Sequence, residues 1–120
     1  SGALDTSWHI AGSGNVSQNP PTSFTFQPSG KILVTEGAVT TNTYDGIVVK
    51  NGIFRLNADG TLDNTWNISG TGVENYGMSG TPAISMQADG SFFMVGDFRT
   101  YNGIIVNGFV KIGTNGAIVP

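Results

Sequence analysis

The chain has 120 residues, a formal net charge of −3, 38% hydrophobic residues and only 11% charged residues. Its five cations leave no basic stripe that would neutralise a phosphate backbone, so we expect no nucleic-acid partner. The absence of cysteine excludes a disulfide framework, a zinc–thiolate cluster and a thiol nucleophile. The longest purely apolar run, 92–95, is far too short to cross a bilayer, which predicts no membrane insertion.

The first half of the chain reads as short strands joined by tight turns. Phe24 and Phe26 alternate with polar neighbours, which predicts a strand with one core-facing side. Residues 31–35 form a nearly continuous apolar and β-branched run, which is typical of an inner strand covered on both faces. The turn at 27–30 ends in glycine, and a further strand is expected at 53–56.

The second half of the chain repeats the first. Three segments recur after 56 to 60 residues: 2–8 at 60–66, 27–30 at 87–90, and 54–56 at 110–112. The corresponding strands are expected at 83–87, 91–95 and 109–112. We divide the single all-β domain 1–120 into repeat one, repeat two and the start of a third repeat, at 2–59, 60–115 and 116–120.

Each repeat offers about four short antiparallel strands, counting a short one around Trp8 or Trp66, which is the content of one β-propeller blade. No segment has the capped periodicity of a helix, so the predicted fold is all-β with two blade-like repeats. A single small sheet leaves its faces and edges exposed, and arrays of such repeats generally need at least three. Three arrangements remain open: a homotrimer that closes a six-bladed ring, an excised part of a longer array, and a monomeric sandwich. We prefer the homotrimer.

The two tryptophans and the aspartates before them occupy equivalent repeat positions. Trp8 and Trp66 are expected in the core between sheets, because large aromatic side chains dominate core energetics. Asp5 and Asp63 precede them by three residues, where a carboxylate can accept a backbone N–H bond two residues on. We therefore expect both aspartates to cap turns.

Two loops, ending at 44–46 and 101–103, combine an aromatic ring, a carboxylate or amide, and a glycine. Such a set can stack on a sugar ring and hydrogen-bond its hydroxyls, or offer oxygen ligands to calcium. The candidate ligand-binding residues are Tyr44, Asp45, Asp97, Arg99, Tyr101 and Asn102. An Asx turn with a packed tyrosine is the simpler interpretation. The dense acidic loop of a calcium site is absent, so we expect no metal and no cofactor.

The sequence predicts no enzyme and no catalytic residue. Glycoside hydrolysis needs two carboxylates across a cleft. At least four of the eight acidic residues lie in repeat turns, and those that remain belong to no motif: Glu36, Asp45, Glu74 and Asp97. His9 has no motif-related partner and is expected to be a surface residue.

Three segments carry a resemblance to a known family: 27–34 (QPSGKILV), 54–63 (FRLNADGTLD) and 95–103 (VGDFRTYNG). Together they resemble the delta-sixty repeat family, which comprises bacterial and phage β-propeller-like repeats of mostly unknown function. The resemblance covers nearly the whole chain, but 37–46 departs from the compact loop seen at 96–103. It implies a surface, secreted or virion setting and carries no catalytic motif.

The leading expectation is a non-enzymatic structural and recognition module of an extracellular appendage, on a virion, such as a phage fibre, or on a bacterial cell surface. Its expected partners are further copies in a homotrimer or neighbouring repeats of a longer chain, together with a cell-surface glycan. One alternative is a carbohydrate-binding module acting on its own, with Tyr44, Tyr101 or Trp8 exposed in a groove. Another is a glycan-active enzyme with two carboxylates facing each other across a pocket.

Overall fold

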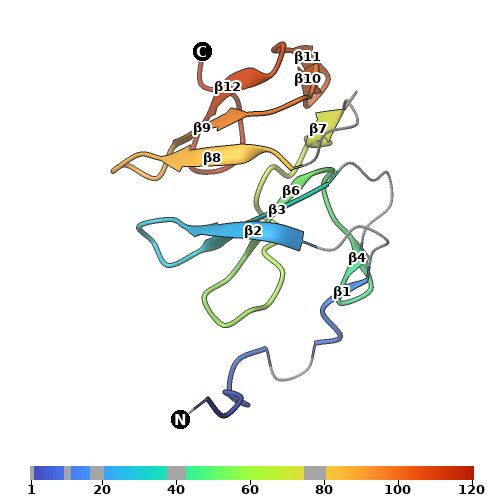
Figure 1. Ribbon diagram of the computed structural model, residues 1–120, viewed down its shortest axis with the longest axis vertical. Coiled ribbons are helices and arrows are strands. Elements are labelled where there is room, and N and C mark those ends of the chain that lie inside the picture. Colours follow the sequence, from blue (N-terminus) through green and yellow to red (C-terminus); the bar gives the residue numbers. More distant parts are fainter. Residues whose placement is uncertain (1, 10–11, 17–20, 38–42, 75–80) are drawn as a thin grey trace.

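The computed structural model is built from small antiparallel sheets (Figure 1). It describes residues 2–9, 12–16, 21–37, 43–74 and 81–120, and within these ranges there is no helix. Nothing in this part of the chain therefore has the helical length and apolarity that a bilayer crossing requires. The strands are β1 Asn15–Val16, β2 Pro21–Phe26, β3 Ile32–Glu36, β4 Thr43–Tyr44, β5 Ile47–Val48, β6 Ile53–Leu56, β7 Val73–Glu74, β8 Ala83–Met86, β9 Phe92–Val95, β10 Thr100–Tyr101, β11 Ile104–Ile105 and β12 Phe109–Ile112.

Each repeat contributes one larger three-stranded sheet. Main sheet one has the order β2-β3-β6, and main sheet two has the corresponding order β8-β9-β12. The tight turns at 27–30 and 87–90 are confirmed, because Gly30 and Gly90 adopt positive φ and each donates its N–H to the glutamine carbonyl three residues earlier. The expected all-β class without helix is thus confirmed for the described residues, whereas closure of a ring stays a prediction.

The fourth strand that we expected around each tryptophan is wrong. Trp8 and Trp66 lie in turns, because the aspartate three residues earlier folds the chain locally instead of leaving it extended. Only single residues extend the main sheets, through isolated bridges from Leu56 to Leu62 and from Ile112 to Ile118.

Each repeat also has a small sheet made of two-residue strands, β1-β4-β5 in repeat one and β7-β10-β11 in repeat two. An isolated parallel bridge between Asn51 and Gly72 joins the two halves of the chain near these sheets. The small sheets carry the loops that the sequence singled out as candidate ligand sites.

The strand register gives each main sheet two distinct faces. Residues directly opposite each other point to the same side. We call the side next to Trp8 or Trp66 the tryptophan face and the other side the opposite face. In main sheet one the tryptophan face carries Phe24, Phe26, Ile32, Val34, Phe54 and Leu56, and in main sheet two it carries Ile84, Met86, Phe92, Met94, Val110 and Ile112.

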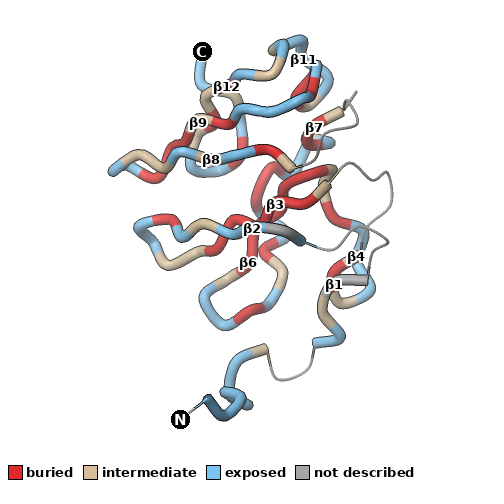
Figure 2. The backbone as a smooth tube through the Cα atoms, viewed as in Figure 1, coloured by how far each residue is buried: buried red, intermediate tan, exposed pale blue. Residues whose placement is uncertain are grey.

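The two repeats pack through unlike faces. Leu33 and Ile53, on the opposite face of main sheet one, are fully buried in one cluster with Trp66 and the tryptophan face of main sheet two. Figure 2 shows buried residues gathered on β3, β6 and β9, where the two sheets lie against each other. Repeat one therefore covers repeat two. The opposite face of one main sheet packs on the tryptophan face of the next, as in a stack of sheets that continues in one direction.

A polar clamp closes the hairpin end of this interface. The Gln27 amide donates to the carbonyls of Gly90 and Thr114, at 2.9 and 3.2 Å, and Arg55 donates to the same Thr114 carbonyl at 2.9 Å. Arg55 also forms an ion pair with Asp63 at 2.8 Å. Because Gln27 and Arg55 are buried, these bonds satisfy groups that would otherwise be costly to remove from water.

The inner strands differ in how far they are covered. Every residue of β3 is buried, which confirms the prediction of a strand covered on both faces. The same prediction for β9 is wrong, because Val95 is exposed and Phe93 is only partly buried on the opposite face of main sheet two. The physical reason is that the opposite face of main sheet one packs on main sheet two, whereas no described part of the chain packs on the opposite face of main sheet two.

We predict that Ile53→Ala lowers the free energy of unfolding by about 2–5 kcal/mol, because it opens a cavity in the interface between the repeats. Phe109 is its counterpart on the uncovered opposite face of main sheet two, so Phe109→Ala should change stability by no more than about 0.5 kcal/mol. Urea denaturation of dilute protein measures both values. Equal costs for the two variants would contradict the packing of unlike faces.

Candidate functional site

The candidate loop of repeat one is held closed by hydrogen bonds. His9 Nε2 lies 2.7 Å from Asp45 Oδ2, and the Gly14 N–H donates to Asp45 Oδ1 at 2.8 Å. The Tyr44 hydroxyl donates to the Gly60 carbonyl at 2.6 Å, which ties the loop to the turn after β6. We call this arrangement the loop latch of repeat one.

Repeat two has an equivalent loop latch with neutral partners. Asn67 and Asn102 exchange two side-chain hydrogen bonds, at 2.7 and 3.0 Å, and the Gly72 N–H donates to Asn102 Oδ1 at 2.9 Å. The Tyr101 hydroxyl donates to the Gly116 carbonyl at 2.6 Å. A histidine–aspartate contact in one repeat therefore replaces an asparagine pair in the other.

Backbone geometry explains why these residue types occupy the latches. The latch residues His9, Asp45, Asn67 and Asn102 all have φ between 50° and 55°, a region that asparagine and aspartate tolerate better than most residues. Gly116 approaches Asn67 so closely that an added Cβ would lie 2.6 Å from the Asn67 Cβ. The turn glycine is thus required for the latch to close.

Local electrostatics differ between the two latches. Burial raises the pKa of the Asp45 carboxyl, but the hydrogen bonds from His9 and from the Gly14 N–H outweigh this effect and hold the pKa below its ordinary value. Burial raises the pKa of Tyr44 to about 12, with a smaller contribution from the Asp45 charge. Burial also raises the pKa of Tyr101. Both tyrosines therefore stay protonated and act as hydrogen-bond donors at neutral pH.

The six candidate ligand-binding residues are not gathered at one open site. Tyr44 and Tyr101 are buried, so neither ring is available for stacking on a sugar in this conformation. Asp45 and Asn102 are engaged in the latches of different repeats, whereas Asp97 and Arg99 are exposed near the second latch. Ligand binding by this set stays a prediction.

Sequence reasoning missed the two residues that follow the tryptophans. His9, expected on the surface, is largely buried against Asp45, with its ring stacked on Tyr44 at a centroid distance of 5.0 Å. A signal was present, because His9 and Asp45 are replaced together by Asn67 and Asn102 in the second copy. Their separation of 36 residues in the chain made the pairing invisible to any local pattern.

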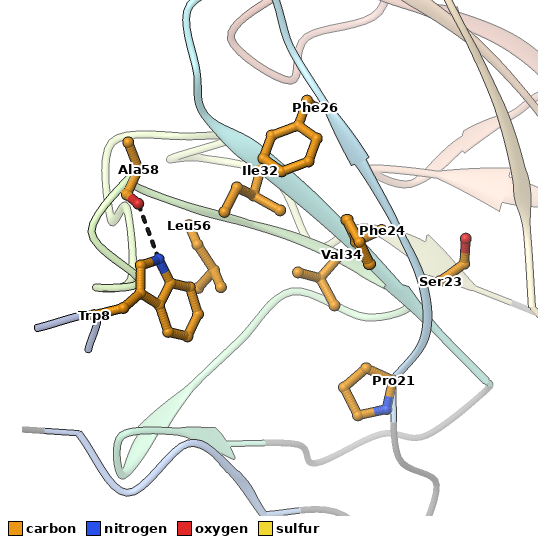
Figure 3. A pocket seen from close by; sticks show the side chains of 9 residues that line it. All are labelled: Trp8, Pro21, Ser23, Phe24, Phe26, Ile32, Val34, Leu56 and Ala58. Carbon is orange, nitrogen blue, oxygen red and sulfur yellow. Dashed lines mark hydrogen bonds between the residues drawn. The ribbon is translucent and has the colours of Figure 1, made fainter. Parts of the chain in front are cut away.

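A second candidate site is an open apolar groove on the tryptophan face of main sheet one. It has a volume of about 660 Å³ and is lined by Trp8, Pro21, Ser23, Phe24, Phe26, Ile32, Val34, Leu56 and Ala58. Figure 3 shows the Trp8 indole beside Leu56, with its N–H donating to the Ala58 carbonyl at 3.0 Å. None of these lining residues is charged. The groove therefore suits an apolar protein surface better than an ionic ligand.

The two tryptophans differ in burial. Trp66 is 2% exposed, which confirms its predicted place in the core. The same prediction for Trp8 is wrong, because Trp8 is 43% exposed at the edge of the groove. The cause is the arrangement of the repeats: main sheet one covers Trp66, and no described part of the chain covers Trp8.

Several acidic residues cap turns or form ion pairs within the fold. Asp5 and Asp63 accept the backbone N–H two residues on, at 2.9 and 3.0 Å, which confirms that they cap turns. A smaller cavity of about 140 Å³ has Asp63 as its one carboxylate, and that group is paired with Arg55 and Lys31. Neither this cavity nor the groove places two carboxylates opposite each other. Among the described residues, no three acidic or histidine side chains form a cluster that could hold a metal ion.

No family model, no curated protein and no solved structure matches the chain.

The difference between the latches predicts a specific acid sensitivity. The folded-state pKa of Asp45 is below the ordinary value of 3.8, so its contribution to stability is present above about pH 4 and is lost as the pH falls through the folded-state pKa. The double variant His9→Asn/Asp45→Asn carries the asparagine pair of repeat two and lacks this contribution. The stability advantage of the wild type over the variant should therefore shrink below about pH 4.

Urea denaturation of both proteins between pH 7 and pH 2 measures this difference. The groups that face His9 are Asp45, the Tyr44 hydroxyl and Asp59, and the last two are kept in the variant. The other aspartates titrate in both proteins and largely cancel in the comparison. A difference that stays constant or grows on acidification would contradict the assigned role of Asp45.

Proposed function

We propose that this chain is a non-enzymatic structural and recognition module of an extracellular appendage, which assembles through its β-repeats. The observation that carries the proposal is the open groove on the tryptophan face of main sheet one, where Trp8, Phe24 and Phe26 stay exposed. The equivalent face of main sheet two is buried by repeat one. A repeat that no described part of its own chain covers is expected to find its partner surface on another molecule.

The amount of exposed apolar side chain supports assembly. Phe24 and Phe26 are 62% and 60% exposed on the tryptophan face of main sheet one, and Phe109 is 60% exposed on the opposite face of main sheet two. Large contiguous apolar patches are uncommon on monomeric soluble proteins and mark interaction surfaces. The unit thus offers an apolar patch at each of its two ends.

The stoichiometry that we propose is a homotrimer. If each repeat acts as one propeller blade, three chains supply six blades, which is within the usual range of ring sizes. Closed rings are the common outcome when unlike surfaces pair with a rotation that closes. The resemblance to delta-sixty repeats supports this proposal and is the reason that we propose a bacterial-surface or virion setting.

A carbohydrate-binding module is the second candidate, because Trp8 presents part of its indole in a groove. Sugar recognition, however, needs polar groups that bind hydroxyls. Ser23 is the one hydroxyl-bearing residue among the nine that line the groove, and the Trp8 N–H already donates to Ala58. The lining therefore favours a protein partner over a glycan at this face.

We expect light scattering over a range of protein concentrations to give a mass three times that of one chain at the upper end. The driving force is burial of the apolar patches at both ends of the unit. A mass of one chain at every concentration, for folded protein, would contradict the proposed assembly.

A further inference from the structure

We infer that the opposite face of main sheet two of one molecule docks into the groove on main sheet one of a second copy. This inference rests on the proposed function, because it names the partner and the surfaces through which assembly occurs. The contact is head-to-tail, since each molecule uses a different face at each end.

The contact already exists once within the chain and can be transferred residue by residue. The groove residues Trp8, Phe24, Phe26, Ile32, Val34 and Leu56 correspond in the repeat to Trp66, Ile84, Met86, Phe92, Met94 and Ile112. In repeat two the corresponding set packs on Leu33 and Ile53. The groove is therefore the same surface without its covering sheet.

The covering sheet also has a free counterpart. Phe93 and Phe109 are the counterparts of Leu33 and Ile53. The registers of β9 with β8 and β12 place both phenylalanines on the opposite face of main sheet two. Phe93 and Phe109 pack edge to face at 5.7 Å, and the Lys111 ammonium lies 5.5 Å from the Phe93 ring centre. This aromatic pair gives an apolar surface at the positions that correspond to Leu33 and Ile53.

Side-chain sizes differ between the two contacts on both sides. The internal contact puts Leu33 and Ile53 against Trp66 and Phe92. The free contact puts the larger Phe93 and Phe109 against Ile32 and Val34, which are smaller than their counterparts Phe92 and Met94. Phe24 and Phe26, in turn, are larger than their counterparts Ile84 and Met86 and form the exposed side of the groove.

The residues of the polar clamp have polar counterparts at the docked contact. Gln27 and Arg55 correspond to Gln87 and Lys111, and the carbonyls of Gly90 and Thr114 correspond to those of Gly30 and Ala58. In the docked pair, Gln87 donates to Gly30 and Ala58 of the second copy, and Lys111 donates to Ala58. In the undocked molecule the Ala58 carbonyl accepts a hydrogen bond from the Trp8 indole N–H.

The first residues of the copy that carries the groove do not block the docked contact. In repeat two, Leu62 extends main sheet one by its bridge to Leu56, but the equivalent place on main sheet two is taken by Ile118 of the same molecule. The first residues of the copy that carries the groove therefore have no strand to join, and its Leu4 stays in solvent, where it is 91% exposed already.

A pair of variants tests the head-to-tail contact. Phe24→Asp places a charge in the groove, and Phe109→Asp places one on the opposite face of main sheet two. Each residue is mostly exposed, so both variants should fold, which circular dichroism and thermal melting can verify. Each variant alone should be monomeric, because one of its two ends cannot dock. An equimolar mixture should form a 1:1 pair with twice the mass of one chain, since one intact groove and one intact opposite face remain.

Ile104→Asp is the matched control, because Ile104 is equally exposed but lies on the small sheet of repeat two. It should assemble as the wild type does. Should the wild type assemble and the mixture stay monomeric, or either single variant assemble normally, the inferred contact is wrong while self-assembly stands. Should the wild type itself remain monomeric, both the contact and the proposed assembly fail.

Discussion

The packing of main sheet one on Trp66 and its sheet is the contact on which the rest of the structure depends. A three-stranded sheet of four- to six-residue strands cannot bury both of its faces by itself. Main sheet two buries its tryptophan face, because Phe92, Met94 and Ile112 pack under Leu33 and Ile53. The same contact leaves the groove on main sheet one and the opposite face of main sheet two open, so stability and assembly follow from one geometry.

The loop latches serve this geometry by fixing the turn before each main sheet. Tyr44 and Tyr101 donate to the carbonyls of Gly60 and Gly116, which lie in the turns between one repeat and the next. Each latch therefore ties the start of one repeat unit to its end and holds the tryptophan beside its sheet. The histidine–aspartate version in repeat one adds charge to a bond network that is neutral in repeat two. Polar side chains that looked like ligand donors in the sequence are thus used within the fold.

Local features were predictable from the sequence, and contacts between distant segments were not. The strands β6 and β12, the glycine turns and the aspartate caps follow from alternation and turn chemistry within a few residues. The exposure of Trp8 could not be read from its position, because Trp8 and Trp66 have equivalent neighbours in the chain and differ only in what covers them. The pairing of His9 with Asp45 likewise depends on a long-range contact.

Acrylamide quenching of tryptophan fluorescence tests most directly whether the groove is the vacant counterpart of the internal contact. The chain has two tryptophans, and Trp66 is buried, so the quenchable emission comes from Trp8. We expect this emission to become protected from acrylamide as the protein assembles with rising concentration, and Trp8→Phe to have little quenchable emission at any concentration. Assembly that leaves Trp8 as accessible as in the monomer would contradict the account.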